Sequence, residues 1–307
     1  MSAPIVVGFD PNGADDAPVR FGLAAARFTG APLIVAAVYG GGLLTNRLAD
    51  GEFREELSAE AHAAFNRLRT RLEGEAGVRA ELRLVEAVTA ARGLTVALEE
   101  EGAGLGVLGS TSRGAVGRTV VGSTAERVIH GAPCPIAVVP HGFEGGELHT
   151  VGVAFTRTPE GEQALRSGVA LARAAGAALR VITVLREEQG AVVVPHASDV
   201  GRAGLYDEQS AAQHRVAVAE TVESALEQAG GGDINAETEL VYGDPADSLI
   251  GFTGSLDLLV MGSRAYGPQR AVLLGGVSRR VIAGSQCPVV VLPRGAEHPL
   301  RELLASR

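Results

Sequence analysis

Short apolar runs alternate with longer amphipathic segments along the whole chain. Ile5–Phe9 is an apolar run short enough for a buried strand, whereas Ala17–Thr29 has apolar residues at helical spacing and is followed by Gly30. Apolar strands separated by amphipathic helices are typical of a parallel sheet with helices on both faces. The pattern therefore predicts an α/β fold of the doubly wound type.

The same alternation continues to the end of the chain and predicts these further elements. The strands expected are Pro32–Tyr39, Arg79–Val85, Gly104–Gly109, Ile136–Val139, Thr150–Phe155, Ala178–Leu185, Ile234–Val241, Leu256–Met261 and Val289–Leu292. The helices expected are Glu52–Glu73, Thr89–Glu101, Ser123–His130, Glu160–Ala175, Ser210–Ala229, Pro245–Thr253 and Val277–Ala283.

The chain contains an internal repeat. The segment 107–114 resembles 260–267, and the Cys-Pro strand at 134–140 resembles 287–293, in both cases with an offset of 153 residues. The earlier Ala-rich helix ending at Gly30 matches the one ending at Gly176 with an offset of 146. One unit was duplicated, and we predict domains at residues 1–143 and 148–295, separated within the polar stretch His141–His149.

Composition narrows the function classes. The net charge is −9 and 21% of the residues are charged, so the broad positive surface that binds nucleic acid or anionic membranes is not expected. Lysine is absent, which excludes phosphate-loop, Schiff-base and protein-kinase mechanisms that need it. Two cysteines and scattered histidines show no metal-ligand spacing, so no metal site is expected. A cytoplasmic location is expected from the absence of an export or membrane-spanning segment.

Ligands of doubly wound sheets bind beyond the carboxyl ends of the strands, where the winding reverses. In the first half Asp10 follows the first strand, Val38 lies at the end of the second, and Gly109 ends the fourth. The segment 109–124 after that strand is rich in glycine and hydroxyl residues and leads into a predicted helix. Glycines allow close backbone approach to an anion, and N–H groups at a helix start favour negative charge. This segment predicts phosphate binding without lysine.

The same segment resembles the nucleotide loop of the universal stress protein family: Gly-x-x-Gly, nine residues, then Gly-Ser or Gly-Thr, a helix and an apolar Cys-Pro strand. Gly109 matches the first glycine, Ser112 replaces the second, and Gly122-Ser123 matches the final pair. Asp10 matches the family acid that the resemblance places near the ribose and adenine. The resemblance thus implies a first-half ATP site, with Mg²⁺ as an accompanying ion, made by Asp10, Val38, Gly109, Ser112, Arg113, Gly122, Ser123 and Thr124.

The second copy departs further from the family pattern. Ala265 replaces the second glycine, and Thr156 stands at the position of Asp10. A lost buried acceptor weakens binding by about 1–2 kcal/mol. The site residues that the resemblance carries to this half are Gly262, Gly275, Gly276, Val277 and Ser278, and we expect the first half to bind nucleotide better.

Family resemblance implies that each half is a five-stranded parallel sheet of order 3-2-1-4-5. Because the last strands, Ile136–Val139 and Val289–Leu292, are apolar edges, we predict that they pair with each other. The function implied is an ATP-binding regulator of the stress response that is not an enzyme. Besides the nucleotide, a homodimer and an unidentified regulatory protein are the partners expected. Two alternatives stay open, namely a slow ATPase and a nucleotide-free scaffold that binds a protein.

Overall fold

A computed structural model describes most of the chain. The described residues are 2–11, 15–40, 63–64, 66–70, 72–73, 77–110, 122–130, 132–185, 208–263, 274–294 and 300–304. The strands are β1 (Ile5–Phe9), β2 (Leu33–Gly40), β3 (Ala80–Ala87), β4 (Leu105–Gly109), β5 (Ile136–Val139), β6 (Thr150–Ala154), β7 (Ala178–Leu185), β8 (Ala236–Tyr242), β9 (Leu258–Gly262) and β10 (Val289–Leu292). The helices are α1 (Ala17–Thr29), α4 (Ala90–Glu100), α5 (Ser123–Ile129), α6 (Pro159–Ala175), α7 (Glu208–Gln228), α8 (Pro245–Phe252), α9 (Gly276–Gly284) and α10 (Arg301–Leu304).

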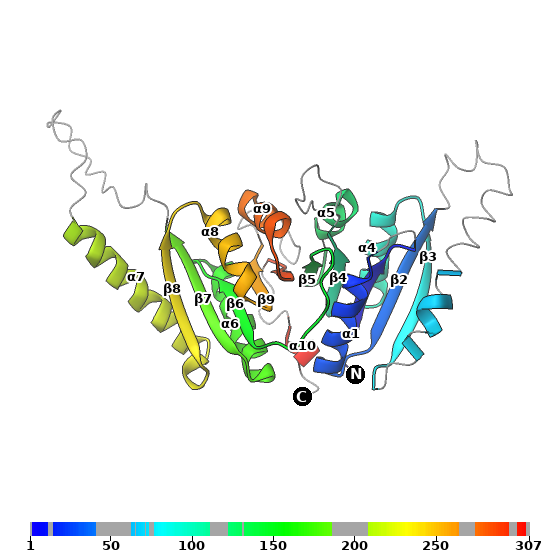
Figure 1. Cartoon of the computed structure of the whole chain (residues 1–307), viewed down its shortest axis with the longest axis horizontal. Helices are drawn as coiled ribbons and strands as arrows, with labels where there is room; N and C mark the ends of the chain where they lie inside the picture. The colour runs from blue at the N-terminus through cyan, green and yellow to red at the C-terminus, as the bar shows by residue number, and fades with distance from the viewer. Residues whose placement is uncertain are drawn as a thin grey trace, which may run out of the picture.

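All ten described strands form one sheet, in the order β3-β2-β1-β4-β5-β10-β9-β6-β7-β8. Within each half the strands are parallel and follow the predicted order 3-2-1-4-5. The halves join where β5 and β10 pair antiparallel, with Val138 opposite Val289 and Ile136 opposite Val291 (Figure 1). The predicted pairing of the two last strands is confirmed.

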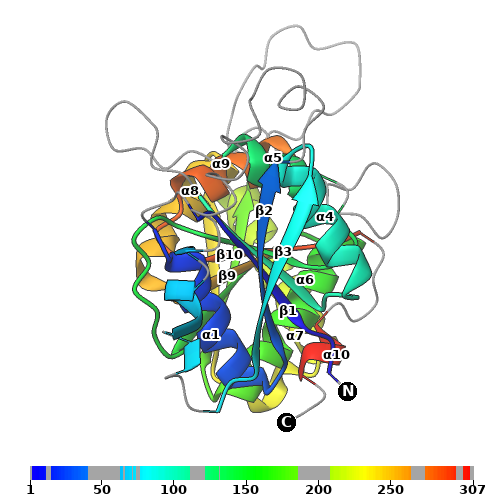
Figure 2. The same cartoon turned by 90° about the vertical axis from the view of Figure 1, so that its right-hand side faces the viewer.

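Helices cover both faces of this sheet and enclose two apolar cores. One core includes side chains of α1, α6, α7 and α10. The other includes side chains of α4, α5, α8 and α9. Figure 2 looks along the twisted sheet and shows helices on either side of it. Strands buried on both faces read as continuous apolar runs, which explains why the strand pattern in the sequence was so plain.

The two halves share their backbone details as well as their topology. Gly30 and Gly176 end α1 and α6 with left-handed φ angles of 71° and 64°. The equivalent glycines Gly22 and Gly168 allow those helices to approach β1 and β6, since a Cβ at either position would lie within 2.4 Å of a valine methyl group. The repeat seen in the sequence therefore corresponds to two copies of one packing arrangement.

Several element ends differ from the predictions. The strand expected at Leu256–Met261 begins at Leu258, after a 3₁₀ turn at Thr253–Ser255, and the carboxylate of Asp257 accepts hydrogen bonds from the backbone N–H groups of His149 and Thr150, both at 2.8 Å. The strand expected from Ile234 begins at Ala236, after a 3₁₀ turn at Gly231–Asp233. Of the helix predicted at 52–73, the structure describes only residues from 63 onward, and these are helical. Helix α10 was not predicted.

Candidate functional site

The first-half candidate site lies at the carboxyl ends of three adjacent parallel strands. β1 pairs with β2 on one side and with β4 on the other, so the chain winds in opposite directions from β1. Asp10 directly follows β1 and is exposed, Val38 lies in the last part of β2, and Gly109 ends β4. These three residues are thus brought to the same edge of the sheet, as predicted.

Val38 and Gly109 have clear packing roles at this edge. Val38 is partly buried against the core under α4, where a Cβ on Gly93 would lie 2.7 Å from its methyl carbons. A Cβ on Gly109 would lie 2.8 Å from Cγ of Pro18 in α1. Glycine at position 109 is therefore required by the close approach of α1, whatever else it does.

The helix start that follows the predicted nucleotide loop is described, but the loop is not. Ser112 and Arg113 lie outside the described residues, so their predicted roles stay predictions. Gly122 is the N-cap of α5 and makes no side-chain cap hydrogen bond, and Ser123 and Thr124 form its first turn. The first N–H groups of a helix need partners from outside it, and Gly122 has no side chain to supply one.

Neighbouring groups fix the base of this edge. Ser110, which follows Gly109, is buried, and its Oγ accepts a hydrogen bond from the backbone N–H of His141 at 3.0 Å. Cys134 lies buried at the opposite, amino end of β5, and burial raises the pKa of its thiol to about 12. A thiol with so high a pKa stays protonated and is not a nucleophile at neutral pH.

Strand pairing shows which residues of the second half correspond to this site. Val7 of β1 is paired with Val35 of β2, and Val153 of β6 is paired with Val181 of β7. Each residue of the second pair follows its counterpart in the first pair by 146 positions. Thr156 therefore occupies the position of Asp10, as the sequence alignment predicted. Its Oγ1 lies 3.3 Å from the Oγ1 of Thr158, the N-cap of α6.

The second-half edge differs most in the first turn of α6. Pro159, the first residue of α6, corresponds to position 13 by the offset of 146, whereas α1 begins at Ala17. Relative to the preceding strand, α6 therefore begins four positions earlier than α1. A Cβ on Gly262 would lie 2.7 Å from the carbonyl oxygen of Glu160 in this turn. The Glu160 side chain is only 9% exposed, and its Oε1 lies 3.2 Å from Nε of Arg294. Sequence reasoning missed this ion pair, because an acid in the first turn of a helix is common for other reasons.

The other predicted residues of the second half lie at the start of α9. Gly275 is the N-cap, Gly276 and Val277 begin the helix, and Ser278 is buried. Arg280 of the same helix contacts Asp244 at 2.9 Å and Asp247 at 2.7 Å.

Asp244 is the N-cap of α8, and its carboxylate accepts hydrogen bonds from the backbone N–H groups of Ala246 and Asp247. The backbone N–H of Asp247, followed by the guanidinium of Arg280, lowers the pKa of Asp244. Across the described ranges, no group of three or more His, Cys, Asp or Glu side chains could hold a metal ion.

Comparisons with known proteins agree with the repeat and with the fold. The model of the Universal stress protein family matches residues 1–140 and again 147–293. A universal stress protein of Mycobacterium bovis is 28% identical over 304 residues, covering 94% of this chain and 99% of the relative. A universal stress protein of Mycolicibacterium smegmatis is 34% identical over 143 residues, which are 45% of this chain and 99% of that protein.

Solved structures share the whole tandem arrangement. The crystal structure of a universal stress protein from Archaeoglobus fulgidus superposes with a TM-score of 0.69 at 21% identity, covering 96% of this chain and all of that one. None of the helices in the described ranges has the length and apolar character needed to cross a membrane. Since the family model matches nearly the entire chain in two consecutive copies, the protein belongs to the universal stress protein family.

Proposed function

We propose that the first half binds an adenine nucleotide, ATP, and that the protein acts as a nucleotide-responsive regulator in the stress response. The observation that carries the proposal is the placement of Asp10, Val38 and Gly109 at the carboxyl ends of the neighbouring strands β1, β2 and β4. This is where doubly wound sheets bind their ligands, and Asp10 supplies an acceptor for a sugar hydroxyl or a ring amine.

The second half is proposed to be the weaker site. Thr156 in place of Asp10 removes a carboxylate acceptor, and the Glu160 carboxylate lies buried in the helix turn that packs on Gly262. A nucleotide phosphate brought to that edge would meet a negative charge, although Arg294 partly offsets it. One nucleotide per chain is therefore the expected stoichiometry.

The role proposed is binding without turnover. The resemblance assigns Asp10 to the sugar rather than to the terminal phosphate, so Asp10 is not placed to activate water. Occupancy by ATP would then act through conformation or through the choice of a protein partner. A slow ATPase and a nucleotide-free scaffold are the alternatives, and the scaffold gains support from Gly109, whose identity is explained by packing on Pro18 alone.

Calorimetric titration of Mg-ATP tests the proposal. The wild type should bind one equivalent, and Asp10→Ala should weaken binding by about 5–30-fold, which corresponds to the loss of one hydrogen bond. Gly122→Asp, which adds a carboxylate at the helix start, should abolish binding. Thr156→Ala is the matched control at the equivalent position and should leave the affinity unchanged.

Two further readouts separate the alternatives. Nucleotide released on denaturation supports binding, and phosphate release over hours would support the ATPase instead. If the wild type shows no heat and releases no nucleotide, the ATP proposal is wrong and the scaffold remains. If Thr156→Ala weakens binding as much as Asp10→Ala, the assignment to the first half is wrong.

A further inference from the structure

A cavity of about 900 Å³ lies between the two halves, on the side of the sheet covered by α1 and α6. β5 and β10 at the centre of the sheet have only four residues each. Helix α1 packs mainly on β1 and β4, and α6 packs mainly on β6 and β9. The space between these two helices is therefore bordered by the linker before β6 and by α10 rather than by a long helix (Figure 1).

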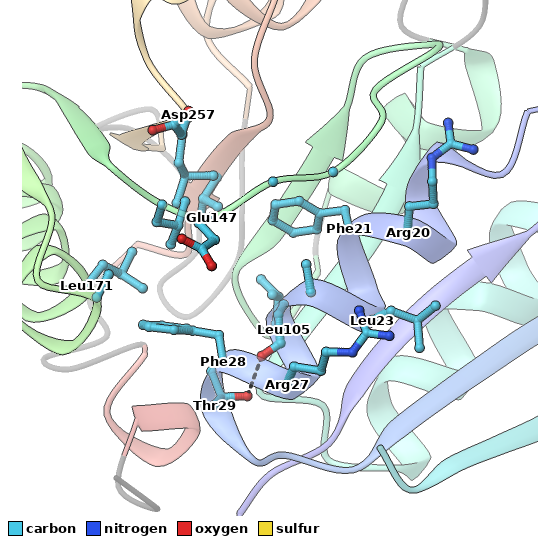
Figure 3. Close-up of a pocket in the computed structure, with 18 of the residues that line it drawn as sticks. Arg20, Phe21, Leu23, Arg27, Phe28, Thr29, Leu105, Glu147, Leu171 and Asp257 are labelled. Carbon is cyan, nitrogen blue, oxygen red and sulfur yellow. Dashed lines mark hydrogen bonds between the residues drawn. The ribbon is translucent and has the colours of Figure 1, made fainter. Parts of the chain in front are cut away.

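Both halves supply the apolar walls of the cavity. Aromatic and aliphatic side chains from α1, α6, the strands and the segment 300–303 line it, and Figure 3 shows those of Phe28, Leu105 and Leu171. They include Phe21, Phe28, Leu105, Leu171, Leu300 and Leu303. A volume of this size suits a small organic ligand, and sites of that kind are mostly apolar with few polar groups.

This cavity is separate from the candidate nucleotide site. Leu105 and Leu258, which line it, are the first residues of β4 and β9, and Thr29 and Ala175 are the last residues of α1 and α6. The cavity thus lies toward the amino ends of the strands, whereas Asp10 and Gly109 lie at the carboxyl ends. A ligand here would not compete with a nucleotide.

The linker residues 144–147 form one side of the cavity as a strap that is anchored at both ends. Before the strap, the ring of Phe143 packs edge-on against Phe21 at 6.1 Å, and the carbonyl oxygen of Phe143 accepts a hydrogen bond from Nε of Arg20 at 2.8 Å. After the strap, the backbone N–H of His149 donates to Asp257. The strap itself is exposed and contains Gly145 at a φ of 92°.

Both arginines and acids line the cavity, but their charged groups are oriented differently. Figure 3 shows the Glu147 carboxylate pointing into the cavity, whereas the guanidinium groups of Arg20 and Arg27 point away from it. Arg20 is paired with Asp15 and Asp16. Within the described part of the chain Glu147 has no ion-pair partner, so its charge is available to a ligand.

We propose that this seam cavity binds an amphiphilic amine, meaning a molecule with one alkyl or aryl body and one protonated amino group. The apolar body would replace water against Phe28, Leu171 and Leu303. The ammonium group would pair with Glu147 beside the ring of Phe21, which favours a cation at its face. The site joins residues of both halves, so it exists only in the tandem chain.

A single-tryptophan variant provides a direct test, because the natural chain has no tryptophan. Phe28→Trp places one fluorophore on the cavity wall. Dodecylamine, dodecanol and dodecanoate, each kept below its aggregation threshold, share one chain and differ only in the head group. We expect saturable emission changes, with dodecylamine binding about tenfold more tightly than dodecanol and dodecanoate binding most weakly.

Two variants in the Phe28→Trp background locate the interaction. Glu147→Gln should reduce the affinity for dodecylamine about tenfold and leave that for dodecanol unchanged, while Glu223→Gln on the exposed face of α7 should change neither. Ala175→Phe, which narrows the cavity from the α6 side, should weaken binding of all three probes without changing the circular dichroism of the fold. The proposal is overturned if no probe saturates, if dodecanoate binds most tightly, or if Glu147→Gln leaves the preference for the amine intact.

Discussion

Replacing Gly168 by alanine should destabilise the protein, although alanine is the better helix former. Gly168 lies in the middle of α6, where its Cα faces β6. A Cβ at this position would lie 2.2 Å from Cγ2 of Val153, whereas carbon atoms in contact are normally about 3.5–4.0 Å apart. Val153 is fully buried, so its side chain has no free space into which it could move.

Two opposing terms set the size of the effect. Alanine in place of glycine in a helix interior stabilises by about 1 kcal/mol. Forcing an extra methyl group into a packed core costs about 1–3 kcal/mol, and the overlap here is large enough to require a shift of the whole helix. With the upper end of that cost, which the large overlap favours, the net loss is about 2 kcal/mol, and the equivalent Gly22→Ala, with a 2.4 Å approach to Val7, should behave alike.

Urea denaturation followed by circular dichroism measures the change in unfolding free energy. Gly251→Ala is the matched control, because a Cβ there meets no atom within 4 Å, and it should stabilise by up to about 1 kcal/mol. Val153→Ala removes the methyl group that clashes, so Gly168→Ala should cost at least 1 kcal/mol less in that background than in the wild type. If Gly168→Ala stabilises the protein as Gly251→Ala does, the close approach of α6 to β6 is refuted.

Three other predictions follow from buried and capping groups. Burial raises the pKa values of Cys134 and Cys287 to about 12 and about 11, so both thiols should resist thiol reagents at pH 8 until the protein is unfolded. The fold should also lose stability above about pH 9, because there the thiols ionise in the unfolded chain but stay protonated in the folded one. Rapid labelling of native protein would contradict this prediction. Arg294→Ala should lower the unfolding free energy by about 3 kcal/mol, because it leaves the Glu160 carboxylate buried without its ion-pair partner. Adding Glu160→Ala should restore part of the lost unfolding free energy. Equal Tm values for Arg294→Ala and the wild type would show that this ion pair does not stabilise the fold. Asp244→Ala should lower the Tm at pH 7 but not near pH 2, because the lowered pKa of the Asp244 carboxyl adds stability above about pH 4 that is lost on acidification. If the difference in Tm between the variant and the wild type does not change with pH, the charge of this carboxylate contributes nothing to stability.

Much of the fold could be predicted because its information is local. The apolar runs of β1 and β4 are buried on both faces, so they stand out against the amphipathic helices between them. The duplication was visible because both copies keep the Cys-Pro strand. Element ends were harder to predict, as at β9, which begins at Leu258 after a 3₁₀ turn at Thr253–Ser255 that the apolar pattern does not show.

The candidate site was only partly predictable, because one residue type can serve two purposes. Gly109 and Gly262 were interpreted as glycines that admit a phosphate, but each also lies against the start of a helix, at Pro18 and at Glu160. A sequence pattern does not separate close packing from ligand approach, since both exclude a Cβ. The seam cavity was not predicted at all, because it depends on how the two halves pack and not on a motif within either.

The pairing of β5 with β10 explains why a second half with a weakened ligand edge would still be retained. All four residues of β5 are buried, and so are all four of β10. Without its partner, each half would expose an apolar strand with unpaired backbone groups at the edge of its sheet, and such edges promote aggregation. To cover the edge of β5, the second half needs only its own strands and core. Thr156, Glu160 and Arg294 leave these strands and this core intact. The second copy therefore serves the first half through this strand pairing, whether or not its own carboxyl edge binds a ligand.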